Sequence, residues 1–115
     1  MKGEGYSNPD YLYKIVSVDE WDKSQNQNWV EDSLMDKDFI HLAEEDQIAH
    51  VVKKFWKNRD YIILKLDCKK LVGYLVHETN PGGTTRYYHL YEGNIPIDSV
   101  IEIVLVSTDK HKEQK

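Results

Sequence analysis

Six short stretches of the chain have the hydrophobic pattern of β-strands, because apolar positions either alternate with polar ones or form a brief continuous run. These stretches are residues 11–16, 38–42, 61–67, 73–78, 85–91 and 98–107. The segment 61–67, YIILKLD, is nearly continuous apolar sequence, which is typical of a central strand covered on both faces. In the last segment, a period of two places Ile101, Ile103 and Leu105 on one face.

Two helices are predicted between these strands. Residues 17–20, SVDE, are a capping-box sequence in which Ser17 and Glu20 satisfy each other's backbone amides, so we expect a helix from Val18 to about Gln25. The spacing i, i+3, i+4, i+7 predicts a second, stronger helix and turns His50 toward solvent. The apolar face of that helix comprises Ile48, Val51, Val52 and Phe55, with Trp56 beside them.

The order of these elements predicts an α+β domain, because strands outnumber helices and do not alternate regularly with them. A length of 115 residues suits one domain, which we expect over residues 11–106. Residues 1–10 are expected to be a flexible lead-in and 107–115 a charged flexible tail. Residues 29–37 are expected to form an irregular loop.

Composition points to a soluble protein of a bacterial-type cytoplasm. The apolar runs are far shorter than the roughly 20 residues needed to cross a bilayer, and no secretory signal pattern is present. The single cysteine, Cys68, has no internal partner for a disulfide. A net charge of −5 disfavours binding of extended nucleic acid, although a few local groups suffice for a small nucleotide. We expect a monomer or weak dimer with no membrane partner.

The sequence RYYHLY, residues 86–91, holds the clearest candidate chemistry. Period two places Tyr87, His89 and Tyr91 on one strand face and Arg86 on the other. Two phenols flanking an imidazole would make an aromatic slot suited to a planar ring. The alternative is that His89 bonds a backbone carbonyl within an aromatic core layer.

Three further residues are candidates for ligand binding. His41 shares a strand face with Phe39 and lies just before the stronger helix, where a crowd of carboxylates disfavours phosphate but leaves a ribose hydroxyl or a carbonyl as partner. Glu78 closes a strand beside a turn sequence and would orient a base or a ribose. Lys14 is a charge in an otherwise apolar strand, placed either to extend its ammonium to an edge or to pair with a carboxylate. For each, a purely structural role is the alternative.

No sequence motif of a familiar enzyme class is present. The chain has no glycine-rich phosphate loop, no G-x-S-x-G and no H-E-x-x-H, and its lone cysteine has no partner at zinc-site spacing. His77 and Glu78 are adjacent on a strand and therefore face opposite ways. We accordingly predict no metal site.

The order of several short motifs resembles a small bacterial family, the domain of unknown function 952 (DUF952). The motifs are LYKI, FIHLA leading into a helix, ILKLD, the later Glu78 and RYYHLY, and together they extend from Tyr11 to Val106. His89 and Tyr91 match the H-x-Y signature of that family. Ala43 and Tyr88 depart from it, since the family has Ser or Thr and Pro there.

The resemblance implies a fold similar to the ADP-ribosyltransferase fold, in which two small split β-sheets, accompanied by helices, form an NAD-binding cleft. LYKI and FIHLA look like segments of the tRNA 2′-phosphotransferases, so Lys14 takes the place of a cleft histidine and His41 matches the histidine of the second segment. The Q/E-x-E signature of toxin-type transferases is absent. The resemblance carries no established activity.

Three hypotheses for function therefore stay open. The first is a transferase or hydrolase acting on NAD or a phosphorylated nucleotide, with His41 and His89 as acid/base or ribose-orienting groups. Its cofactor-binding residues would be Lys14, Glu78, Arg86, Tyr87 and Tyr91. The second is a non-catalytic module that binds a planar nucleotide between aromatic side chains, and the third is a structural or protein-interaction domain.

Overall fold

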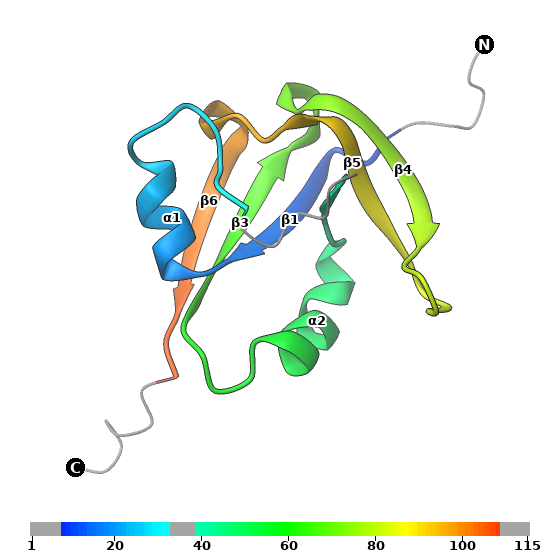
Figure 1. Cartoon of the computed structure of the whole chain (residues 1–115), viewed down its shortest axis with the longest axis horizontal. Helices are drawn as coiled ribbons and strands as arrows, with labels where there is room; N and C mark the ends of the chain where they lie inside the picture. The colour runs from blue at the N-terminus through cyan, green and yellow to red at the C-terminus, as the bar shows by residue number, and fades with distance from the viewer. Residues whose placement is uncertain (1–7, 33–38, 109–115) are drawn as a thin grey trace.

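The computed structural model describes residues 8–32 and 39–108, which form two separate antiparallel sheets and two α-helices (Figure 1). In chain order the elements are β1 (Tyr11–Val16), α1 (Val18–Ser24), β2 (Phe39–His41), α2 (Ile48–Phe55), β3 (Tyr61–Asp67), β4 (Val72–Thr79), β5 (Arg86–Asn94) and β6 (Val100–Val106). The sheet orders are β1-β3-β6 and β2-β5-β4. The predicted α+β class with two small sheets is confirmed.

The first sheet is built around β3, whose apolar sequence suits a strand with a neighbour on each edge. β1 runs antiparallel to it, with Leu12 opposite Leu66 and Lys14 opposite Leu64. All three leucines have no exposed surface. The prediction that residues 61–67 form a central strand is confirmed.

The second sheet is centred on β5 and contains a bulge near the start of β4, where the pairing register shifts between Val72 and Tyr74. Gly73 has φ 113°, and a Cβ on Gly93 would lie 1.7 Å from the Val72 carbonyl oxygen. Only glycine tolerates so close a backbone approach. Beyond the bulge, Val72 pairs with Asn94, so β5 extends past residue 91, where the strand was expected to end. β4 and β5 are also strongly curved (Figure 1), as strands with a bulge commonly are.

The start of α1 follows the predicted capping box. The Ser17 hydroxyl accepts a hydrogen bond from the Glu20 amide at 3.0 Å, and the Glu20 carboxylate accepts one from the Ser17 amide at 2.7 Å. The helix ends at Ser24, and Gln25 caps it. Trp21 packs against the main core, so this short helix covers an apolar face of the first sheet.

α2 follows a 3₁₀ turn at Glu45–Gln47 and covers a second apolar cluster, in which Trp56 and Tyr61 are buried. The assignment of Phe55 to the apolar face is wrong, because Phe55 is 58% exposed whereas Trp56 is 5% exposed. The helix ends at Phe55, and the change in backbone direction at Trp56 turns the indole toward Tyr61. His50 is exposed, as predicted.

The main core lies between the two sheets and draws on both, with Leu64 and Ile62 from β3 and Leu90 and Ile40 from the second sheet. The sheets are joined where Tyr13 and Ala43 exchange two backbone hydrogen bonds of 2.8 and 2.9 Å. The inner face of the second sheet contributes its side chains to this core. The side chains that alternate with them therefore project from the outer face of the sheet.

Residues 1–7, 33–38 and 109–115 lie outside the described residues, so the expected lead-in, much of the expected loop and the expected tail stay predictions. None of the described helices has the length and apolar character needed to span a bilayer.

Candidate functional site

The outer face of the sheet β2-β5-β4 gathers aromatic and titratable side chains from all three strands. Strand periodicity and register place there Phe39 and His41 of β2, Tyr87, His89 and Tyr91 of β5, and Tyr74, Val76 and Glu78 of β4. We call this set of residues the aromatic face. It contains five of the seven predicted site residues, while Lys14 and Arg86 lie elsewhere.

The two candidate imidazoles are direct neighbours on the aromatic face. His41 pairs with His89 in the register of β2 and β5, and their ring centroids are 5.1 Å apart in an edge-to-face arrangement. Phe39 stacks on His89 with a centroid distance of 4.0 Å. His89 is thereby 1% exposed, whereas His41 is half-buried. A ligand on this face would therefore meet His41 before His89.

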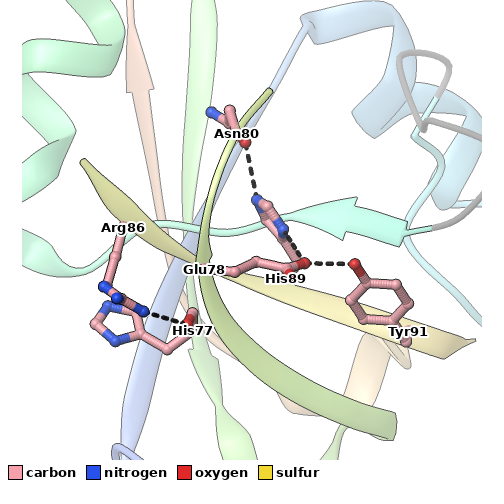
Figure 2. A network of polar contacts seen from close by, with 6 residues as sticks. All are labelled: His77, Glu78, Asn80, Arg86, His89 and Tyr91. Atoms are coloured by element: carbon pink, nitrogen blue, oxygen red, sulfur yellow. Dashed lines mark hydrogen bonds and ion pairs between the residues drawn. The ribbon is translucent and has the colours of Figure 1, made fainter. Parts of the chain in front are cut away.

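His89 is held at both ring nitrogens by polar partners, as Figure 2 shows. Its Nδ1 lies 2.7 Å from Oε2 of Glu78, and its Nε2 lies 2.9 Å from Oδ1 of Asn80. The hydroxyl of Tyr91 donates to the same Glu78 oxygen. Because the ring lies between two side chains of the β4 end, the imidazole is locked in one orientation and in turn fixes the carboxylate.

The Glu78 carboxylate is the accessible polar group of this network. Its side chain is 34% exposed, and the hydrogen bonds from Tyr91 and then His89 hold its pKa below the usual value of 4.5. Glu78 is therefore ionised at neutral pH. An oriented, ionised carboxylate is suited to accept hydrogen bonds from ligand hydroxyl groups or to stabilise a nearby positive charge.

A stacked aromatic pair, of which one ring is exposed, continues the face away from Glu78. Tyr74 and Tyr91 stack with ring planes 12° apart and centroids 5.5 Å apart, and Tyr74 is 51% exposed. Tyr87 is half-buried and lies opposite Glu78 in the register. These rings provide a surface on which a flat ligand can stack.

Arg86 lies on the opposite face of the sheet from His89, as strand periodicity predicts. Its predicted role in cofactor binding stays a prediction. Its guanidinium donates to the His77 carbonyl at 3.4 Å, and Figure 2 shows it apart from the Glu78 network. The His77 ring stacks on Tyr88 on this same side.

Lys14 is buried and serves the junction between the sheets instead of the aromatic face. Its ammonium forms a 3.0 Å ion pair with Asp32 and donates to the backbone carbonyl of His41 at 3.2 Å. With 7% of the residue exposed, Lys14 cannot approach a ligand on the outer face. These contacts anchor β2 against β1, and the predicted role of Lys14 in cofactor binding stays a prediction.

Sequence reasoning missed Asn80, Tyr74 and the stacking role of Phe39. Extending the period of two past the end of β4 places Asn80 on the side of Glu78, but its sequence context, TNPGG, indicates only a turn. Tyr74 lies just past a bulge that alternation does not predict. Phe39 was assigned to the face of His41, yet contact with His89 depends on strand pairing.

A hollow of about 530 Å³ lies away from the aromatic face, between the start of β1 and the turn before α2. Its lining comprises Pro9, Asp10, Tyr11, Tyr13, Glu44, Glu45, Asp46 and Lys65. Four carboxylates in this lining would repel a phosphate-bearing ligand. Within residues 8–32 and 39–108, no three His, Cys, Asp or Glu side chains are grouped to hold a metal ion.

Comparison with known proteins agrees with the resemblance seen in the motifs. The crystal structure of protein CC0527 from Caulobacter crescentus is 28% identical, covers 87% of this chain and 89% of that one, and superposes with a TM-score of 0.73. The solution NMR structure of CC0527 covers 90% of each chain at 28% identity and a TM-score of 0.69. No curated protein matches the sequence. The family model described as "Protein of unknown function (DUF952)" matches residues 15–103, and the chain belongs to this family.

Proposed function

We propose that the chain binds a nucleotide of the NAD type, or a related ribonucleotide, on the aromatic face. The observation that carries the proposal is the ionised Glu78 carboxylate, fixed by Tyr91 and His89 on the face that also carries the exposed ring of Tyr74. A ribose presents vicinal hydroxyl donors and a base presents a flat ring, so the two parts of a nucleotide match the two parts of this surface.

The base would stack on Tyr74. One side of that ring is covered by Tyr91 at 5.5 Å, and its 51% exposure leaves room for a second flat ring. Stacking of a base on an aromatic side chain contributes about 1–3 kcal/mol. Such stacking tolerates different bases, so we expect broad base preference.

The ribose would lie over Glu78, where its hydroxyls donate to the carboxylate. His89 has both ring nitrogens engaged and is 1% exposed, so its part is to orient Glu78. His41 is the more accessible imidazole and is the group assigned to proton transfer if the bound nucleotide reacts.

Two features support an NAD-type ligand over a polyanion. The DUF952 resemblance implies a split-sheet fold of the ADP-ribosyltransferase type, and the two small sheets that meet at the Tyr13–Ala43 junction support this part of the proposal. The chain has a net charge of −5, and Lys14 and Arg86 both lie away from the aromatic face. Because neither cation is near the proposed ligand, its phosphates would point to solvent.

The test is calorimetric titration with NAD, ADP-ribose, AMP and a 2′-phosphorylated nucleotide. We expect Glu78→Gln and Tyr74→Ala each to weaken binding about tenfold. The control is Tyr11→Ala, which removes a 46% exposed tyrosine from the acidic hollow and should leave affinity unchanged. The proposal would be overturned if none of the four nucleotides bound at millimolar concentration, or if only the Tyr11 variant lost binding.

Chromatography of the incubated NAD separates binding from turnover. Release of nicotinamide that disappears in His41→Ala would assign the chain to the transferase or hydrolase hypothesis. Binding with unchanged NAD would assign it to the non-catalytic module.

A further inference from the structure

The outer edge of β6 is an exposed apolar strand edge. β6 pairs with β3 alone in the order β1-β3-β6, and no strand among the described residues pairs with its other edge. A strand in this position presents a row of backbone N–H and C=O groups able to pair with another strand. Edges that must stay single are ordinarily blunted by charge, proline or a bulge. β6 carries one charge, Glu102, and a register shift at Ile101, where its pairing with β3 moves from Lys65–Glu102 to Leu66–Val100, so its regular stretch is Glu102–Val106.

The side chains of β6 are apolar and unusually exposed. Ile101, Ile103, Val104 and Leu105 have exposed fractions of 46%, 53%, 49% and 63%. Ile103 lies opposite Leu64, and Leu105 lies opposite Ile62, so they continue the core face of the sheet beyond the part that is covered. A contiguous apolar surface of this kind marks an interaction site.

The sequence of β6, VIEIVLV, is nearly symmetric about Ile103. In an antiparallel pair of two copies with the twofold axis at Ile103, Glu102 faces Val104 on either side of the axis, and Leu105 lies next to the bulged Ile101 of the second copy. Ile103 meets its own copy in this register. A register centred on Glu102 would instead oppose two carboxylates directly, which is destabilising.

We propose that β6 pairs antiparallel with β6 of a second copy of this chain, with the twofold axis at Ile103, and joins two three-stranded sheets into one of six strands. The occupant is a second copy because the strand's own pattern complements itself, as an isologous interface requires. This proposal is independent of nucleotide binding, since β6 and the β4–β5 ribbon lie on opposite sides of the molecule in Figure 1.

The expected dimer is weak. A single strand of seven residues is far fewer than the roughly 20–30 residues a side of a standard stable interface. We therefore expect a dissociation constant on the order of 10–100 μM.

Sedimentation velocity from micromolar to millimolar protein tests the proposal. The wild-type chain should move from monomer to dimer mass, and Ile103→Lys, which sets two ammonium groups against each other at the axis, should stay monomeric. Phe55→Lys is the matched control, because it places the same charge at a side chain that is 58% exposed on α2. Circular dichroism checks that each variant is folded. A wild-type chain that stays monomeric to about 1 mM, or an Ile103→Lys variant that still dimerises, would overturn the proposal.

Val104→Lys tests the register itself. With the axis at Ile103 the new ammonium faces Glu102 of the second copy twice, so the dimer should be retained or strengthened while Ile103→Lys abolishes it. Disruption equal to that of Ile103→Lys would contradict the register. In a Cys68→Ser background, Ile103→Cys should form a disulfide across the axis on oxidation faster than Phe55→Cys does. Equal rates would likewise count against it.

Discussion

Side chains alternate between two faces in both sheets, but the inner faces and the outer face of β2-β5-β4 bury different kinds of side chain. On the inner faces, apolar residues such as Leu64 of β3 and Leu90 of β5 meet in one core. On the outer face of β2-β5-β4, a buried histidine is surrounded by Glu78, Asn80 and stacked rings. A buried apolar side chain needs only complementary shape, whereas a buried polar one must bring hydrogen-bond partners with it. The difference separates the part that holds the fold together from the part suited to chemistry.

The largest effect is expected where the inner face is perturbed. Leu64→Ala removes a side chain with no exposed surface, so the free energy of unfolding should fall by about 3 kcal/mol. Ile103→Ala, in the neighbouring strand of the same sheet, removes a side chain that is 53% exposed and should cost less than about 1 kcal/mol. Urea unfolding at low micromolar concentration measures both. Equal losses would show that exposure does not separate the two positions.

The next effect concerns the bulge that shapes the second sheet. Gly93→Ala would place a Cβ 1.7 Å from the Val72 carbonyl oxygen, and the forced backbone shift should cost about 2–3 kcal/mol. Gly83→Ala is the control, because its Cβ would lie no closer than 3.4 Å to any neighbour outside the adjoining residues. Urea unfolding of both variants checks this, and a Gly93 variant as stable as the control would contradict the close approach.

His89→Ala tests whether the outer face is structural as well as chemical. The substitution removes a side chain that is 1% exposed and leaves Glu78 and Asn80 without its two hydrogen bonds, so we expect a loss of about 2 kcal/mol. His50→Ala removes an exposed imidazole and should change stability by less than about 0.5 kcal/mol. Thermal and urea unfolding measure the stability of both variants. If His89→Ala and His50→Ala lost the same free energy of unfolding, the hydrogen bonds of His89 would not stabilise the fold.

A smaller effect is expected in the pH dependence of stability. Hydrogen bonds from Tyr91 and then His89 lower the pKa of Glu78 in the folded protein. Its ionisation therefore contributes stability that is present above the unfolded pKa near 4.5 and is lost as pH falls through the lower, folded pKa. Glu78→Gln should flatten the acid side of the stability profile measured by urea unfolding from pH 3 to 7. An unchanged acid slope would mean that Glu78 has the same pKa in both states.

A final effect concerns Cys68, which packs against the shared core. Burial first, and then the neighbouring Asp67 and Asp10, raise its pKa from 9.0 to about 11. At pH 8 the thiol should react with iodoacetamide roughly a hundredfold more slowly than in the unfolded chain. Its contribution to stability is complete below pH 9 and is lost as pH rises toward 11. Mass spectrometry of the alkylated protein measures the rate, and equal rates with and without denaturant would contradict the raised pKa.

Alternation along single strands predicted which residues share the aromatic face, but it did not predict the loop residues that contact the site candidates. It placed His89 and Tyr91 together and Arg86 opposite, since these relations depend only on the period of two. Asn80 and Asp32 were not predicted, because each reaches its partner through a turn or loop whose path the local pattern does not specify. The same limit applies at β6, where an apolar strand pattern does not distinguish a covered strand from an edge.

The central claim is that the aromatic face is where ligand binds, and amide chemical-shift mapping by NMR during a titration with NAD tests it most directly. We expect the largest shifts in β4 and β5 around Glu78, Tyr74 and Tyr91, with little change in β6 or around the acidic hollow. Shifts centred on Tyr11 and Glu44 at that hollow, or none at all, would contradict it.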